Sequence, residues 1–172
     1  MKSAFLIFST TLTLFGSLDS RAADFSFEVS RPKFRISLPG LPAMKMDVHP
    51  MHGSQPHLQF LGSEGPYTVS VITPTAAAGM TALECAASTV RSLAKRRGVP
   101  ESAQMYKARL NANTFLAIYV SPLDGVVRLN AHVLSAAGGT HCVEVHASKV
   151  SVSDDELAPW IDGFDKANIE SR

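Results

Sequence analysis

The strongest constraint on the fold lies between residues 114 and 150, where three long segments of strand-forming residues follow one another. Thr114–Ser121, Val126–Ser135 and Thr140–Val150 are rich in β-branched and other apolar residues. Pro122–Gly125 and Ala136–Gly139 separate them, and both sequences are typical of tight turns because Pro, Asp and Gly favour turn conformations. Strands joined by short turns pair with their neighbours along the chain, so we expect an antiparallel meander.

Apolar residues also recur at every second position in the first half of the chain, which is the period of a strand with one buried face. These segments are 25–29, 34–38, 58–60 and 67–71. The second should end at Leu38, because Pro39 and Pro42 cannot donate hydrogen bonds inside a ladder. The last two should form a hairpin through a turn at 62–66.

Two helices are expected. Thr81 and Glu84 have the spacing of a capping box, in which each side chain accepts a hydrogen bond from the backbone of the other residue. Apolar residues follow at helical spacing, at Leu83, Ala86, Ala87, Val90, Leu93 and Ala94. Gly98 is well placed to end this helix. A second helix should begin at Pro159, with an apolar face of Trp160, Ile161, Phe164 and Ala167.

The order of these elements is four strands, a helix, about four strands and a second helix, which predicts the α+β class. We expect an antiparallel sheet of about seven or eight strands, in two hairpin or meander blocks, packed with two helices. Residues 23–172 have the length of one ordinary domain.

Residues 1–22 have the features of a cleavable secretory signal peptide. Lys2 precedes an apolar run from Ala4 to Leu18, and Ser20-Arg21-Ala22 places small residues where a signal peptidase reads them. The run is about 15 residues long, short of the roughly 20 that cross a bilayer. We therefore expect cleavage after Ala22 or Ala23 and a periplasmic mature protein; an uncleaved amphipathic anchor is the alternative.

The charges of the chain are balanced, with 16 Lys and Arg against 15 Asp and Glu. A balanced domain has no long-range attraction for nucleic acid or anionic lipid. Another protein, in the same compartment, is the expected partner, and no segment after the signal peptide is apolar enough to span a membrane. The sequence does not indicate an oligomeric state.

The chain contains two cysteines, Cys85 and Cys142. An even number of cysteines in an exported protein suggests a disulfide. Cys85 lies nearly opposite the apolar stripe of its helix as read from the sequence, however, and need not face the strand that carries Cys142. Two buried free thiols are the alternative.

One segment has the composition of a metal-binding loop. Its sulfur and imidazole groups suit copper in either oxidation state, and the candidate ligands are Met44, Met46, His49, Met51, His52 and His57. They follow no fixed ligand spacing, so the alternative interpretation is an ordinary polar loop between strands.

The sequence around Cys142 also contains groups that could do chemistry. Along a strand, Cys142, Glu144 and His146 share one face, and His141 points to the other. Cys142 and His146 are then about 13 Å apart, too far to share one ion or one proton. Glu144 and His146 are neighbours on that face, and we interpret them as a structural pair rather than a catalytic one.

Phe34-Arg35-Ile36-Ser37-Leu38-Pro39-Gly40 resembles the F-x-I-x-x-P opening of PsbP-like domains of the periplasm and thylakoid lumen. The later helix, the meander and a closing helix with Trp160 and Phe164 follow the same order. The resemblance covers nearly all of the chain after the signal peptide and implies a PsbP-like α+β fold. It also implies a non-catalytic binding or assembly module. The segment of Met and His residues after Pro42 departs from the pattern.

The sequence assigns no catalytic or cofactor-binding residue. It has no Gly-x-Ser-x-Gly, His-Glu-x-x-His, P-loop or dinucleotide-binding motif. The expected function is therefore that of a non-enzymatic, protein-binding module without a cofactor. Within that class, we favour an inhibitor or immunity protein against an envelope-targeted toxin or hydrolase. The alternative is a periplasmic copper-binding protein that uses residues 44–57, and a hydrolase ranks third.

Overall fold

The structure is a computed structural model that describes residues 24–45, 57–96, 99–151 and 153–171. Within these ranges, nine strands form two antiparallel sheets, and two α-helices accompany them. The expected α+β class is confirmed. The number of strands is higher than predicted, and they are divided between two sheets instead of one. The predicted signal peptide lies outside the described residues.

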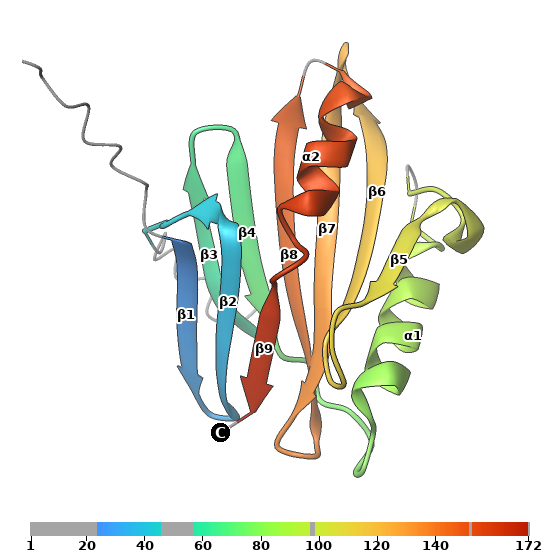
Figure 1. The fold of residues 1–172 in the computed structure, drawn as a ribbon. Coiled ribbons are helices and arrows are strands. Elements are labelled where there is room, and N and C mark those ends of the chain that lie inside the picture. Colours follow the sequence, from blue (N-terminus) through green and yellow to red (C-terminus); the bar gives the residue numbers. More distant parts are fainter. Residues whose placement is uncertain (1–23, 46–56, 97–98, 152, 172) are drawn as a thin grey trace, which may run out of the picture.

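The smaller sheet has three strands in the order β1-β2-β9. They are β1 Asp24–Ser30, β2 Lys33–Pro42 and β9 Asn168–Ser171. Alternate side chains of β1 and β2, such as Phe25 and Phe34, face the interior and are almost fully buried. β9 comes from the C-terminal end of the chain and lies beside β2, so the two ends of the domain meet in this sheet (Figure 1).

The prediction that the second strand ends at Leu38 is wrong, since β2 continues to Pro42. The register of β1 against β2 shifts between Asp24 and Phe25, which pair with Pro42 and Leu38. The residues between Leu38 and Pro42 therefore have no partner in β1, and β9 pairs only with Phe34–Ser37. Pro39 lies where no ladder hydrogen bond is needed, which is the position that a strand tolerates.

The larger sheet has six strands in the order β3-β4-β8-β7-β6-β5. They are β3 Leu58–Glu64, β4 Tyr67–Ile72, β5 Tyr106–Arg109, β6 Phe115–Leu123, β7 Val126–Ala137 and β8 His141–Ser151. The predicted hairpin is β3–β4, and the predicted meander is β6–β7–β8; both are confirmed. The sequence reading missed β5 and β9, each only four residues long.

The main core lies between the two sheets. Val71, Leu129 and Val145 of the larger sheet are fully buried there against the aromatic and aliphatic side chains of β1 and β2. Helix α2 (Leu157–Asp162) closes one end of this core with the buried Trp160, after a short 3-10 helix, Asp154–Glu156. Helix α2 therefore begins two residues before the predicted start at Pro159.

The end of α2 also differs from the prediction. The helix stops at Asp162, so Phe164 and Ala167 of the predicted apolar face follow the helix rather than belonging to it. Both are nevertheless buried in the core. Pro159 lies in the first turn of the helix, where a backbone N–H has no helical acceptor and a proline costs little.

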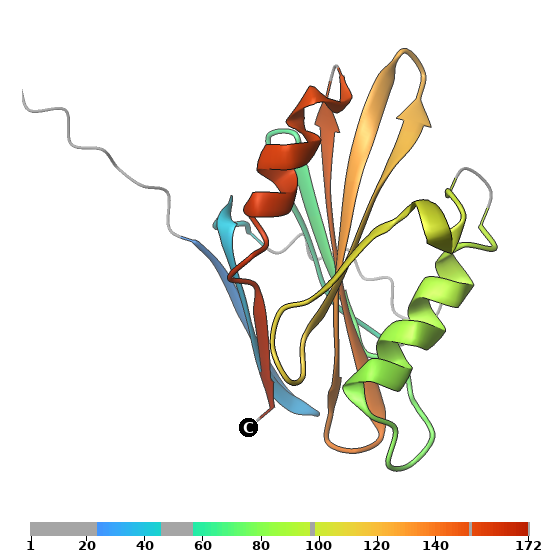
Figure 2. The same ribbon diagram turned by 45° about the vertical axis from the view of Figure 1, so that its right-hand side comes forward.

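Helix α1 (Ala82–Leu93) covers the opposite face of the six-stranded sheet, which therefore lies between α1 and the three-stranded sheet (Figure 2). The predicted capping box is present: the Thr81 hydroxyl accepts from the N–H of Glu84, and the Glu84 carboxylate accepts from the N–H of Thr81. The helix ends at Leu93, before the predicted stop at Gly98, which lies outside the described residues. A short 3-10 helix, Ser102–Gln104, precedes β5.

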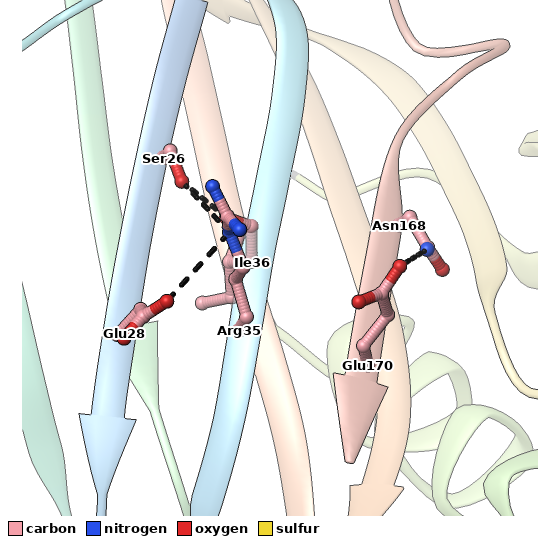
Figure 3. A network of polar contacts seen from close by, with 6 residues as sticks. All are labelled: Ser26, Glu28, Arg35, Ile36, Asn168 and Glu170. Carbon is pink, nitrogen blue, oxygen red and sulfur yellow. Dashed lines mark hydrogen bonds and ion pairs between the residues drawn. The ribbon is translucent and has the colours of Figure 1, made fainter. Parts of the chain in front are cut away.

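Polar residues cover the outer face of the three-stranded sheet (Figure 3). Arg35 of β2 donates to the hydroxyl of Ser26 at 3.4 Å and lies 3.8 Å from a carboxylate oxygen of Glu28. On β9, Asn168 donates to Glu170 at 2.8 Å. The side chains of Arg35 and Glu28 are 47% and 61% exposed, so this ion pair contributes little to stability.

In the part of the chain that the structure describes, no helix is both long enough and apolar enough to cross a membrane.

Candidate functional site

A cluster of polar side chains lies on the face of the six-stranded sheet that α1 partly covers. Asn130 and His132 of β7 are 3% and 1% exposed, and Glu144 of β8 is 8% exposed. The strand period brings them together, because alternate residues share one face and His132 is directly opposite His146 in register. Buried polar groups need hydrogen-bond partners, so each one constrains its neighbours.

His132 links two of these groups. Its Nδ1 lies 2.9 Å from Oε1 of Glu144, and its Nε2 lies 3.4 Å from the hydroxyl of Tyr119 on β6. A carboxylate can only accept, so Nδ1 donates to Glu144. In the neutral ring, Nε2 then accepts from the Tyr119 hydroxyl. The three side chains form a hydrogen-bonded series that holds the Glu144 carboxylate in one orientation.

His146 is held by a second set of bonds. Nδ2 of Asn130 donates to the carbonyl oxygen of Arg128 and to the Ser121 hydroxyl, both at 3.0 Å. The Asn130 Oδ1 is therefore free to accept, and Nε2 of His146 lies 3.1 Å from it. His146 must carry its proton on Nε2, which assigns its tautomer.

The surroundings displace three pKa values in this cluster. Burial raises the pKa of Tyr119. Burial is the main cause, and the neighbouring His132 the second, of a His146 pKa that is lowered to about 3. Burial alone would raise the pKa of Glu144, but the hydrogen bond and charge of His132 and the positive charge of Arg96 outweigh it, and the pKa is lowered. At neutral pH the cluster therefore contains a neutral His146 and an ionised Glu144.

The Glu144 carboxylate also lines a pocket of about 460 Å³ between α1 and the 74–80 segment. The pocket is lined by Ile72, Pro74, Thr75, Ala76, Ala77, Met80, Ser88, Thr89, Ser92, Arg96, Cys142 and Glu144. It therefore has one acidic and one basic side chain, with three hydroxyl groups contributed by α1. An ionised carboxylate and a guanidinium facing one cavity can bind a ligand that carries both charges.

A disulfide between Cys85 and Cys142 joins α1 to β8 beside this pocket. The Cα atoms are 5.4 Å apart, within the range that a disulfide spans. The disulfide predicted from the number of cysteines is thus present. The expectation that Cys85 lies nearly opposite the buried stripe of its helix was wrong. Helix α1 buries Cys85, Ala86, Val90 and Leu93, whereas Leu83 is 61% exposed.

A second cavity lies on the other side of α1, against β5 and β6. We call it the α1–β5 groove; its volume is about 460 Å³. It is lined by Leu83, Ala86, Ala87, Val90, Arg91, Ser102, Lys107, Ala108, Arg109, Phe115, Leu116 and Leu134. Most of these residues are apolar, and the three charged ones are all basic. The groove can therefore receive apolar side chains beside a negative charge.

The predicted metal ligands are only partly within the described residues. Met44 packs against the main core. His57 is exposed, and its backbone carbonyl accepts from the N–H of Thr73 at 2.8 Å. Met46, His49, Met51 and His52 lie outside the described residues. Among the residues that are described, no group of three or more His, Cys, Asp or Glu is placed to hold a metal ion.

Glu144 and His146 share a face with Cys142, as the alternation predicted. Sequence reasoning missed Tyr119, Asn130 and His132, which complete the cluster. The signal was present in β7, where Asn130 and His132 alternate with Leu129, Ala131 and Val133. In a strand flanked by two other long strands, polar residues on the second face indicate a buried polar cluster.

The structure is that of an α+β domain with two cavities beside α1. No protein-family model matches the sequence, and no curated protein matches it.

Proposed function

We propose that this chain is a non-enzymatic protein-binding module whose contact surface is the α1–β5 groove. The occupant we propose is a segment of another protein that carries apolar and acidic side chains. The observation that carries the proposal is an apolar cavity with only basic residues among its charged lining. Charge of one sign around an apolar centre steers and orients a partner of the opposite sign.

The apolar part of the groove offers contact area that the folded domain does not use. Leu83 in the lining is 61% exposed, and Tyr106, which precedes the lining residue Lys107 on β5 and does not itself line the groove, is 44% exposed. Covering one such side chain contributes roughly 1–2 kcal/mol from apolar burial. Tyrosine is also among the residues that contribute most binding energy at protein interfaces.

The basic residues supply the selectivity. Arg109 lies over the ring of Phe115 at 5.7 Å, and its guanidinium donates to the carbonyl oxygens of Asn111 and Ala112 at 3.1 Å. Lys107 donates to the carbonyl of Ser102 at 2.7 Å. These contacts hold two positive charges in fixed positions before a partner arrives, which lowers the entropy cost of binding.

Strand β5 adds a further means of contact. It is the last strand of the six-stranded sheet, and β6 is its only neighbour among the strands that the structure describes. An extended peptide can pair with such an edge through its backbone while its side chains enter the adjacent groove. The combination favours a polypeptide over a small amphiphile.

Selection of peptides from a displayed library on the immobilised domain tests this function. We expect the selected peptides to combine acidic and apolar residues, and Leu83→Asp to abolish their binding. Val150→Asp is the matched control, since Val150 is 40% exposed and does not line the groove. The proposal would be contradicted by peptides that bind the Leu83→Asp variant as well as the wild-type domain. Peptides that bind equally well without acidic residues would also contradict it.

An inhibitor or immunity protein in the periplasm is the specific role that we propose for such a module. The Cys85–Cys142 disulfide supports an oxidising compartment, where disulfides persist. The intact mass of the exported protein tests the compartment: we expect an N-terminus at Ala23 or Asp24. A protein that still begins at Met1 would overturn it.

A further inference from the structure

We propose that the pocket between α1 and the 74–80 segment binds a small zwitterion of the α-amino acid type. This site is separate from the α1–β5 groove and does not depend on it. The inference begins from two opposite charges in the lining of one cavity, those of Glu144 on β8 and Arg96 after α1. An α-amino acid carries an ammonium and a carboxylate on one carbon, which is the complementary arrangement.

Glu144 is the proposed ammonium site. Its Oε1 accepts from His132 Nδ1, and a carboxylate has a second oxygen with lone pairs of its own. The side chain is 11% exposed, so its charge is shielded from most water. A charge in such a place attracts a cation more strongly than a surface carboxylate does, because the local dielectric constant is lower.

Arg96 is the proposed carboxylate site. It lies three residues beyond the end of α1, and its charge is close enough to Glu144 to lower the pKa of that carboxyl. A guanidinium binds a carboxylate through two parallel hydrogen bonds, which fixes the orientation of the ligand as well as its charge. Ser92 of α1 lines the same pocket and adds a hydroxyl within it.

The remaining walls indicate the ligand's side chain. Thr75, Ser88 and Thr89 carry hydroxyl groups, but most of the other lining residues are apolar, so the group beyond the two charges should be aliphatic. The apolar residues are Ile72, Pro74, Ala76, Ala77 and Met80. The volume of about 460 Å³ lies toward the lower end of the 300–1,000 Å³ that is common for small-molecule sites.

The walls are also fixed in place before a ligand binds. The N–H of Cys142 donates to the carbonyl of Pro74 at 3.0 Å, and that of Ala76 donates to the carbonyl of Thr140 at 2.8 Å. The disulfide holds α1 to the same strand. Binding therefore requires little ordering of the protein, which favours affinity for a small ligand.

Calorimetric titration with three related probes tests the proposal: L-leucine, 4-methylpentanoic acid and 3-methylbutylamine. The acid lacks the ammonium group of leucine, and the amine lacks its carboxylate. We expect L-leucine to bind the protein, and each analogue to bind at least about tenfold more weakly, the effect of losing one charged hydrogen bond. Failure of L-leucine and the other aliphatic L-amino acids to bind at millimolar concentration overturns the proposal.

Two variants separate the two charges. Arg96→Gln should weaken the binding of L-leucine at least about tenfold and leave the affinity for 3-methylbutylamine unchanged. Lys95→Gln is the control, because Lys95 is exposed and does not line the pocket. Glu144→Gln should weaken the binding of 3-methylbutylamine and leave the affinity for 4-methylpentanoic acid unchanged. Because this change also alters the His132 bond, circular dichroism must show that the variant is folded. Leucine binding that survives Arg96→Gln contradicts the proposal whatever Glu144→Gln does.

Discussion

The imidazole rings of His132 and His146 stack across the β7–β8 pair, with their centroids 4.4 Å apart and their planes 12° apart. The two residues are directly opposite in register, which is where cross-strand side chains interact most. Adding a proton to His146 places a positive charge beside a second imidazole. Because His146 is largely buried, water solvates that charge poorly. The pair is therefore most favourable while His146 is neutral.

We expect the free energy of unfolding to fall as the pH is lowered from about 6.5 towards 3. The folded pKa of His146 is about 3, well below its ordinary value of 6.5, so the unfolded chain binds more protons in this window. Stability is then fully present above about pH 6.5 and is lost on acidification. The loss should be roughly 2–3 kcal/mol between pH 7 and pH 4, measured by urea unfolding.

His146→Gln tests the origin of this loss, because glutamine does not titrate and can still donate to Asn130. The slope of stability against pH between 4.5 and 6.5 should become shallower in this variant. His57→Gln, at an exposed position, should keep the original slope. Below pH 4.5 both variants should continue to lose stability, since the lowered pKa of Glu144 contributes there. An unchanged slope in His146→Gln would refute the assignment.

The bond between His132 and Glu144 should couple the two residues energetically. His132→Phe removes the donor and leaves a buried carboxylate unpaired, which should cost roughly 3–5 kcal/mol. Glu144→Leu should cost less, because it leaves one imidazole N–H of His132 without its acceptor and no unpaired carboxylate. The double variant should be more stable than the sum of the two losses predicts, by roughly 1–3 kcal/mol. Additive losses in denaturant unfolding would show that the pair is not coupled.

The disulfide should be a large part of the stability of the domain. It links residues 57 positions apart, and closing a loop of that length stabilises by roughly 4 kcal/mol on the chain-entropy account. Cys85→Ala with Cys142→Ala should lower the unfolding free energy by an amount of that order. The oxidised wild-type protein, unfolded in denaturant, should not react with a thiol-alkylating reagent. Two modified cysteines before reduction would show that the bond is absent.

The long elements of this fold could be read from the sequence because their signals are local. Alternation and turn residues located β6, β7 and β8, and the spacing of Thr81 and Glu84 located the start of α1. The short strands β5 and β9 were missed because four residues contain too little periodicity; their pairing with β6 and β2 is a tertiary effect. The division into two sheets likewise depends on long-range pairing.

The candidate site was predictable only in part, for the same reason. Alternation placed Glu144 beside His146 on one face, but the partner strand supplies His132 and Asn130, and register is needed to bring them together. The face of α1 was misjudged because Leu83 was counted as buried. Leu83 instead lies on the edge of the α1–β5 groove, and the true buried stripe begins at Cys85.

The copper alternative is tested by titrating Cu(I) and Cu(II) against the mature protein. Two of its six candidate ligands are described: Met44 is packed against the core, and His57 is exposed just before β3. A thioether held in packing contacts must leave them to reach an ion, so we expect affinity weaker than about 1 μM for either oxidation state. His49→Ala, His52→Ala and His57→Ala together should then change little. Submicromolar binding that this triple variant abolishes, but that His141→Ala preserves, would make the copper-binding function the better proposal.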